Sequence, residues 1–160
     1  MPPTLAVIWR AADLLFATGV DAVVEVLPPL ASTPAPTTPP WVRGLFSHRG
    51  RLIPLVDVSG LLGAAAVADR KSNRVLVVRC ALNPESVPST TGLWVQSVVD
   101  LERVDFSAAG SHPGFDTESG RFLGPVVETR WGQVQLVNPE QLFSPQQASV
   151  LAERLKEAAA

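Results

Sequence analysis

The stretch from Trp41 to Gly63 constrains the fold of this chain more than any other. Its first part, Arg43 to Arg51, contains three arginines, one histidine and no acidic residue. Its second part, Leu52 to Val58, is a run of mostly branched apolar residues that includes Pro54 and Asp57. The first part predicts an exposed turn, and the second predicts a strand with a buried face.

Pro54 restricts where that strand can lie, because proline has no backbone N–H to donate to a neighbouring strand. We therefore expect the strand at the edge of a sheet, or with a bulge at Pro54. In the preceding turn Arg49 stands between His48 and Gly50, where glycine lets the backbone turn sharply. Since arginine is enriched in interface hot spots, an edge strand beside this turn would offer a docking surface for a protein partner.

Composition and charge exclude several classes of protein. With 160 residues, the chain fits a single domain, 1–160, made of one unit or of two small subdomains that share a core. A 46% hydrophobic content and a positive mean hydropathy exclude disorder over most of the length. No apolar run approaches the roughly 20 residues of a membrane span, so no direct membrane insertion is expected. The net charge of −2 argues against nucleic acid as a general partner.

Cys80 is the single cysteine and cannot form an internal disulfide, which suits a reducing cytoplasm. It lies in an apolar run and is expected to be a small core residue, not a nucleophile. No phosphate-binding or dinucleotide-binding glycine motif is present. Neither His48 nor His112 has a second histidine or a cysteine at metal-ligand spacing. We therefore expect no catalytic residue, no metal and no cofactor, and a protein that is not an enzyme.

The rest of the chain predicts short strands joined by turns. Residues 28–40 contain six of the 15 prolines and predict an extended connector. The continuous apolarity of Arg74 to Ala81 predicts a strand buried inside a sheet. Residues 107–120 are expected to form a flexible loop. The other apolar runs and expected strands are Leu5–Trp9, Leu14–Ala17, Val20–Leu27, Gly92–Val99 continued by Leu101–Phe106, and a hairpin of Arg121–Glu128 with Gln133–Val137.

The tail, 144–160, predicts an amphipathic helix. Ser144 offers an N-cap, Pro145 suits the first helical position, and Gln147 stands three residues after the cap. Leu151 and Leu155 then repeat at i, i+4. The chain as a whole therefore reads as a mostly β, barrel-type protein closed by one helix. Of its tryptophans, Trp94 is expected in the core, whereas Trp41 and Trp131 could be surface anchors, although local packing is the preferred interpretation.

The central stretch resembles the CheW-like domain, the coupling module of bacterial chemosensory arrays. The family's central motif is matched, in order, by Gly44, Arg49, Gly50, Pro54, Leu55, Val56, Asp57, Val58, Leu62 and Gly63. Segments on both sides match as well: Val23 to Val26 upstream, and Thr91 to Leu101 and Leu136 to Phe143 downstream. The resemblance therefore covers nearly the whole chain.

The resemblance implies two interlocked five-stranded SH3-like barrels with a hydrophobic core between them. It also implies a non-catalytic adaptor in the cytoplasm, associated with membrane receptor arrays. Such an adaptor links the cytoplasmic tip of a methyl-accepting receptor to the regulatory domain of a CheA-type histidine kinase. The residues that match binding or substitution-sensitive positions of the family are Val23, Glu25, Gly44, Arg49 and Gly50, while Pro54 and Asp57 are expected to set the fold, with Asp57 accepting turn N–H groups.

This chain departs from the family pattern at three positions. Ser47 replaces a usual asparagine, His48 an aliphatic or aromatic residue, and Gln96 an acidic one, so partner specificity is expected to differ near Ser47 and His48. The segment 121–126 resembles the version in surface-sensing systems that control a diguanylate cyclase. The alternative function is a small β-barrel module that binds a small molecule or an oligonucleotide. Such a module needs a basic groove with exposed aromatic residues, and this sequence has only one short basic window.

Overall fold

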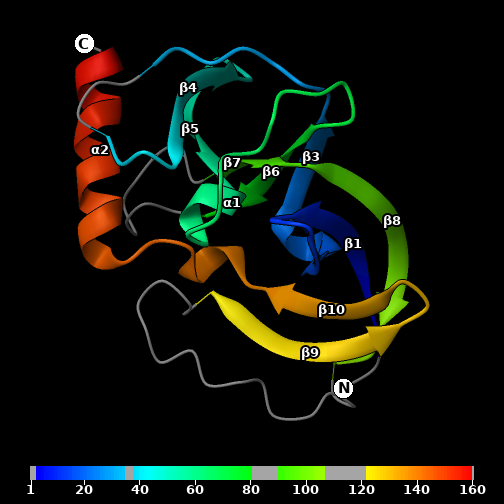
Figure 1. Ribbon diagram of the computed structural model, residues 1–160. Helices are drawn as coiled ribbons and strands as arrows, with labels where there is room; N and C mark the ends of the chain where they lie inside the picture. Colours follow the sequence, from blue (N-terminus) through cyan, green and yellow to red (C-terminus); the bar gives the residue numbers. More distant parts are fainter. Residues whose placement is uncertain (1–2, 35–37, 81–89, 107–121, 160) are drawn as a thin grey trace.

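The computed structural model describes residues 3–34, 38–80, 90–106 and 122–159. Within these ranges the chain forms ten strands and two α-helices (Figure 1). The strands are β1 (Thr4–Ala11), β2 (Leu14–Gly19), β3 (Val23–Leu27), β4 (Val42–His48), β5 (Arg51–Asp57), β6 (Arg74–Arg79), β7 (Thr90–Val95), β8 (Ser97–Val104), β9 (Leu123–Thr129) and β10 (Gly132–Val137). The α-helices are α1 (Val58–Leu61) and α2 (Pro145–Ala159).

The strands form two five-stranded sheets, as the resemblance implied. The first sheet has the order β8-β1-β2-β10-β9, and the second has the order β3-β6-β7-β5-β4. Each sheet contains one parallel pair, β2 with β10 and β5 with β7, and its other pairs are antiparallel. The two sheets therefore repeat one topology, in which β8, β1, β2, β10 and β9 correspond to β3, β6, β7, β5 and β4.

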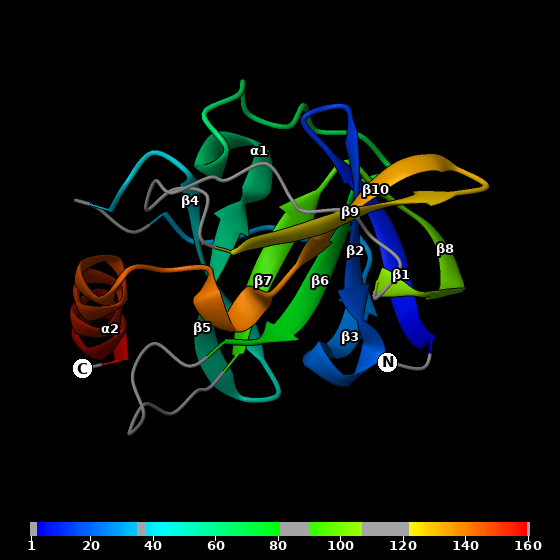
Figure 2. The same cartoon turned by 90° about the horizontal axis from the view of Figure 1, so that it is seen from below.

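Three apolar clusters hold the molecule together. One lies within the first sheet and includes Ile8 and Val134, and a second lies within the second sheet and includes Phe46 and Leu55. The largest cluster draws residues from both sheets and from α2, so it is the expected core between the barrels. Seen from below, α2 lies on the side of the second sheet that faces away from β8 (Figure 2).

The helix α2 begins as the sequence predicted. The Ser144 hydroxyl accepts a hydrogen bond from the Gln147 N–H at 3.2 Å, and the Gln147 side chain accepts one from the Ser144 N–H at 2.9 Å. This reciprocal pair is a capping box. Leu151 and Leu155 are both buried in the largest cluster, and Trp41 stacks on Phe143 just before the helix at a centroid distance of 5.8 Å.

The prediction that Pro54 lies in an edge strand is wrong. Strand β5 is interior, because β7 pairs with it on the side away from β4. That parallel pairing starts only at Leu55, one residue after the proline. The bulge lies in β4, where Arg43 is the extra residue between Val42 and Gly44, and not at Pro54. Strand β6, by contrast, is interior and buried as expected.

Two further strand boundaries differ from the prediction. The single strand expected through Gly92–Val99 and beyond is divided at Gln96, and its halves β7 and β8 belong to different sheets. The Gln96 N–H donates to the Arg10 carbonyl at 2.9 Å, which fixes the crossing between the sheets. Residues Val20–Ala22 form a 3₁₀ turn before β3. The loop expected at 107–120 lies outside the described residues.

Candidate functional site

The turn between β4 and β5 has the two-residue geometry of a tight hairpin. Arg49 and Gly50 have φ values of +52° and +80°, the left-handed region that a type I′ turn requires at both central positions. Glycine adopts this geometry freely, but arginine does so at a cost in free energy. The Arg49 side chain is 68% exposed, so the turn holds a cation outward on a rigid hairpin.

Three side chains meet where the second sheet curls to bring its two edges together. His48 Nε2 lies 2.7 Å from Glu25 Oε2, and Arg49 Nη2 lies 3.6 Å from the same oxygen. Glu25 belongs to β3 and His48 to β4, which are the two edge strands of that sheet. We call Glu25, His48 and Arg49 the edge cluster. It brings together two of the predicted site residues, Glu25 and Arg49, from distant parts of the chain.

The edge cluster is electrostatically coupled. The hydrogen bond from His48 lowers the pKa of the Glu25 carboxyl, and the charges of Arg49 and His48 lower it further against the opposing effect of desolvation. The His48 side chain is only 9% exposed, whereas Glu25 is 38% exposed. His48 therefore holds the carboxylate from beneath, and Arg49 keeps most of its hydrogen-bonding capacity for another molecule.

Two other predicted site residues lie away from the edge cluster. The half-buried Val23 packs its side chain against the largest core cluster. Gly44 is buried where the connector crosses β4, and there Thr33 and Leu45 exchange two backbone hydrogen bonds of 2.7 and 2.8 Å. A Cβ atom at Gly44 would stand 2.3 Å from the Thr33 carbonyl oxygen. Its absence is what permits this backbone approach.

The two residues expected to set the fold are both buried. Asp57 is 3% exposed and caps α1 by accepting from the Gly60 N–H at 3.3 Å. It also accepts from the Val67 N–H at 2.9 Å, as predicted for a residue that serves turn N–H groups. Pro54 pairs with Leu45 of β4 and lies inside the second sheet.

The first sheet carries a counterpart of the edge cluster. Arg130, in the turn between β9 and β10, pairs with Asp100 and with Glu102 on the opposite edge strand β8. In the shared topology this turn corresponds to the turn of Arg49. Trp131 lies beneath Arg130 and remains 42% exposed, in contrast to Trp94, which is 3% exposed as expected of a core residue.

His48 is the one member of the edge cluster that the sequence did not assign to the site. Its position was notable only as a departure from the family pattern, and 23 residues separate it from Glu25. Nothing in either local sequence indicates that they pair, because the contact depends on the curl of the sheet. In the described part of the chain no three His, Cys, Asp or Glu side chains gather as they would around a metal ion. No helix there is long and apolar enough to span a bilayer.

Comparison with known proteins identifies the family. The model of the CheW-like domain matches residues 6–147. The protein PilI of Pseudomonas aeruginosa is 39% identical over 94 residues, which are 59% of this chain and 49% of PilI. The chemotaxis protein CheW of Helicobacter pylori is 34% identical over 67 residues, which are 42% of this chain and 41% of that protein. The matches thus span half or less of the length of these two relatives.

Other similarities are longer. The chemotaxis protein CheW of Rhizobium meliloti is 28% identical over 136 residues and covers 84% of both chains. The crystal structure of the scaffolding protein TtCheW from Thermoanaerobacter tengcongensis superposes with a TM-score of 0.77 over 92% of this chain and 96% of that one, at 22% identity, which establishes the shared fold. Since the family model spans most of the sequence, this chain belongs to the CheW-like domain family.

Proposed function

We propose that this chain is a non-catalytic adaptor that couples methyl-accepting chemoreceptors to a CheA-type histidine kinase. Family membership supports this proposal, as do the chemotaxis proteins and the scaffolding protein among its relatives. The observation that carries it is the edge cluster, where an exposed arginine projects from a hairpin turn held by a half-buried histidine and a carboxylate. A rigid, charged turn on a stable barrel suits docking more than chemistry.

In this proposal the receptor tip contacts Arg49 and the adjoining parts of β3 and β4. Arg49 supplies a charge for a carboxylate of the receptor, and Gly50 keeps the turn tight. Val23 and Gly44 act indirectly, the first by packing β3 against the core and the second by seating the connector on β4. The kinase partner is the regulatory domain of a CheA-type protein. We include in the proposal the surface-sensing pathway that the resemblance of segment 121–126 implies.

The test uses the receptor tip and the kinase regulatory domain encoded in the same genome. Wild-type protein is expected to bind both in a pull-down and by calorimetry. Arg49→Glu is expected to weaken receptor binding by about 10-fold or more, because it reverses an exposed charge in the proposed interface. Circular dichroism should be unchanged, since the Arg49 side chain is largely outside the fold.

Arg103→Glu is the matched control, because Arg103 is exposed on β8 of the other sheet. It makes the same charge change and is expected to leave receptor binding intact. The adaptor proposal fails if folded wild-type protein captures neither partner. The assignment of Arg49 fails if both variants weaken binding equally.

A further inference from the structure

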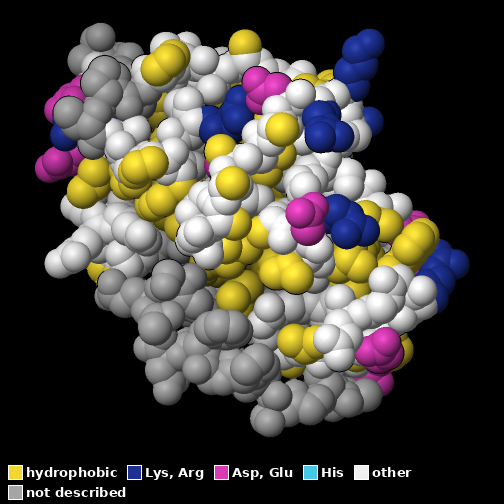
Figure 3. All heavy atoms as spheres, viewed as in Figure 1, with side chains coloured by type: hydrophobic (Ala, Val, Ile, Leu, Met, Phe, Trp, Pro, Cys, Tyr) yellow, Lys and Arg dark blue, Asp and Glu magenta, His cyan; other side chains and the backbone are white. Residues whose placement is uncertain are grey.

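A groove separate from the edge cluster lies beneath the connector, at the start of β4. It has a volume of about 640 Å³, within the range of small-molecule sites. The connector residues Pro29 to Ser32 form one side, and the loop Asp69 to Lys71 forms the other. Arg43 and Trp94 line the remainder. In the space-filling view, Lys and Arg side chains gather in the upper part of this face (Figure 3).

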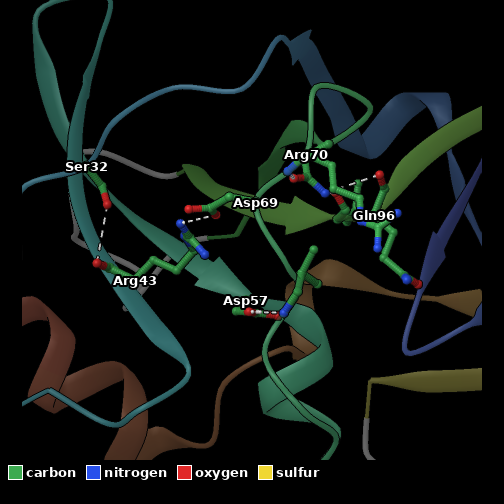
Figure 4. A network of polar contacts seen from close by, with 9 residues as sticks. Ser32, Arg43, Asp57, Asp69, Arg70 and Gln96 are labelled. Carbon is green, nitrogen blue, oxygen red and sulfur yellow. Dashed lines mark hydrogen bonds and ion pairs between the residues drawn. The ribbon is translucent and has the colours of Figure 1, made fainter.

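Arg43 has an unusual environment in this groove. As the bulged residue of β4, it leaves the ordinary alternation of the strand, and its guanidinium carbon lies 4.2 Å from the centre of the Trp94 ring. Its Nη2 atom lies 3.0 Å from Asp69 Oδ1, and Figure 4 shows its side chain pointing toward that carboxylate. Arg43 is 28% exposed, whereas Asp69 is 79% exposed. The cation is therefore held in place, and its anionic partner is a surface side chain that solvent can replace.

Trp94 leaves a polar group unpaired next to this arginine. The residue is 3% exposed, yet among the described residues its indole N–H has no acceptor. A buried donor without a partner costs free energy, and such groups in native proteins call for an explanation. The indole N–H lies in the plane of the ring, so an acceptor oxygen could meet it only at the edge of the ring and not on the face that Arg43 covers.

The charged residues that line the groove indicate which class of molecule it would attract. Arg43, Arg70 and Lys71 line it against the single acid Asp69. Anions are attracted by this excess of cations, and guanidinium groups bind phosphate and carboxylate in paired hydrogen bonds. We propose that the groove binds a small molecule that carries an oxyanion group, a phosphate or a carboxylate, with Arg43 as its principal contact.

The groove and the edge cluster lie at opposite ends of one strand. Arg43 is the second residue of β4, and Arg49 follows its last residue. A strand of this length spans roughly 20 Å, so a ligand in the groove would not cover the edge cluster. This inference goes beyond the adaptor function and does not depend on it. It gives the adaptor a site at which a metabolite could bind while the edge cluster remains open to a protein partner.

The experiment titrates the full chain with four probes: inorganic phosphate, pyrophosphate, ATP and citrate. Tryptophan fluorescence and calorimetry report binding, because Trp94 lines the groove. Saturable binding of at least one probe below millimolar concentration is expected. Phosphate-bearing probes that bind when citrate does not would identify a phosphate ligand, and the reverse would identify a carboxylate.

Variants assign the binding to the groove. Arg43→Gln is expected to weaken it by about 10-fold or more, and Lys71→Gln by a few-fold. Lys71 is exposed in a loop, so its substitution tests the groove even if Arg43→Gln proves unstable. Arg103→Gln, on β8, is the control and should bind as wild type does. The proposal is overturned if no probe saturates, or if binding survives both groove substitutions.

Discussion

Gly44 lies where the connector crosses β4, and its missing side chain lets Thr33 pair with Leu45. Its φ of +148° is also a conformation that other residues rarely adopt. We expect Gly44→Ala to lower the free energy of unfolding by about 2 kcal/mol or more, because the methyl group meets backbone that cannot yield cheaply. Urea denaturation followed by circular dichroism measures this change.

Gly63→Ala separates the two causes. Gly63 has a φ of +82°, but a Cβ atom there meets nothing within 4 Å. It should therefore carry only a conformational cost of about 1 kcal/mol. Equal losses in the two variants would show that the contact with the connector contributes nothing.

The edge cluster makes the titration of Glu25 depend on His48. The hydrogen bond from His48 is the largest cause of the lowered pKa of this carboxyl. A carboxyl whose pKa is lower in the folded state adds stability above its unfolded pKa. That contribution is lost as the pH falls through the pKa of Glu25 in the folded state, which lies below the ordinary pKa of 4.5 for this carboxyl. We expect His48→Leu to raise the pKa of Glu25 in an NMR titration, and Glu25→Gln to remove this part of the pH dependence of stability.

A Glu25 carboxyl that titrates identically in wild type and in His48→Leu would show that His48 does not govern it.

At the residue scale, interactions between residues close in sequence were predictable, and interactions between residues distant in sequence were not. The Asp57 cap was predictable because its N–H donors follow within ten residues. The tight turn was predictable from the Arg-Gly dipeptide. The pairing of Glu25 with His48 was not, because it requires the two edges of one sheet to meet. The Arg43 groove was missed for the same reason, since Trp94 and Asp69 reach it from other elements.

At the scale of elements, the capping box of α2 offers a direct test. Ser144→Ala removes the hydroxyl that accepts from the Gln147 N–H, and we expect a loss of about 1 kcal/mol in the free energy of unfolding. Ser149→Ala, at an exposed position within the same helix, should be neutral or slightly stabilising because alanine is the better helix former. A thermal or urea denaturation series compares the two. Equal effects would argue that the cap does not hold the helix.

The helix and the β9–β10 hairpin were predictable because their signals are local in sequence. The interior position of β5 in its sheet was not predictable. Pro54 lacks a backbone N–H at one position only, and β7 pairs with β5 from the next residue, Leu55, onward. The division of the predicted strand into β7 and β8 at Gln96 was not predictable either. No glycine or proline marks a turn between the two strands, and the crossing is fixed by the hydrogen bond from the Gln96 N–H to the Arg10 carbonyl. Strand order depends on partners distant in sequence, and a local pattern does not specify them.

At the scale of the whole molecule, Cys80 reports on the joining of the two sheets. It is 1% exposed in the cluster shared by both sheets and α2, and burial raises the pKa of its thiol to about 11. We expect a thiol reagent at pH 8 to modify it only when the molecule opens, so that the rate rises with urea as unfolding does. An added cysteine at the exposed Ser47 is the control and should react at once. Rapid modification of native wild type would mean that the sheets separate locally.

The interleaved order of the strands has a consequence for synthesis. The second sheet is drawn from one continuous piece of chain, Val23 to Val95, and can pair as soon as that piece has emerged. The first sheet needs both ends, since β1 and β2 pair with β8 and β10. At ribosomal rates the hairpin of β1 and β2 waits on the order of ten seconds for its partners. Its buried residues, Ala6 to Trp9 and Phe16 to Thr18, alternate between the two faces of the hairpin, and they are thus the surfaces that a chaperone has the longest time to bind during translation.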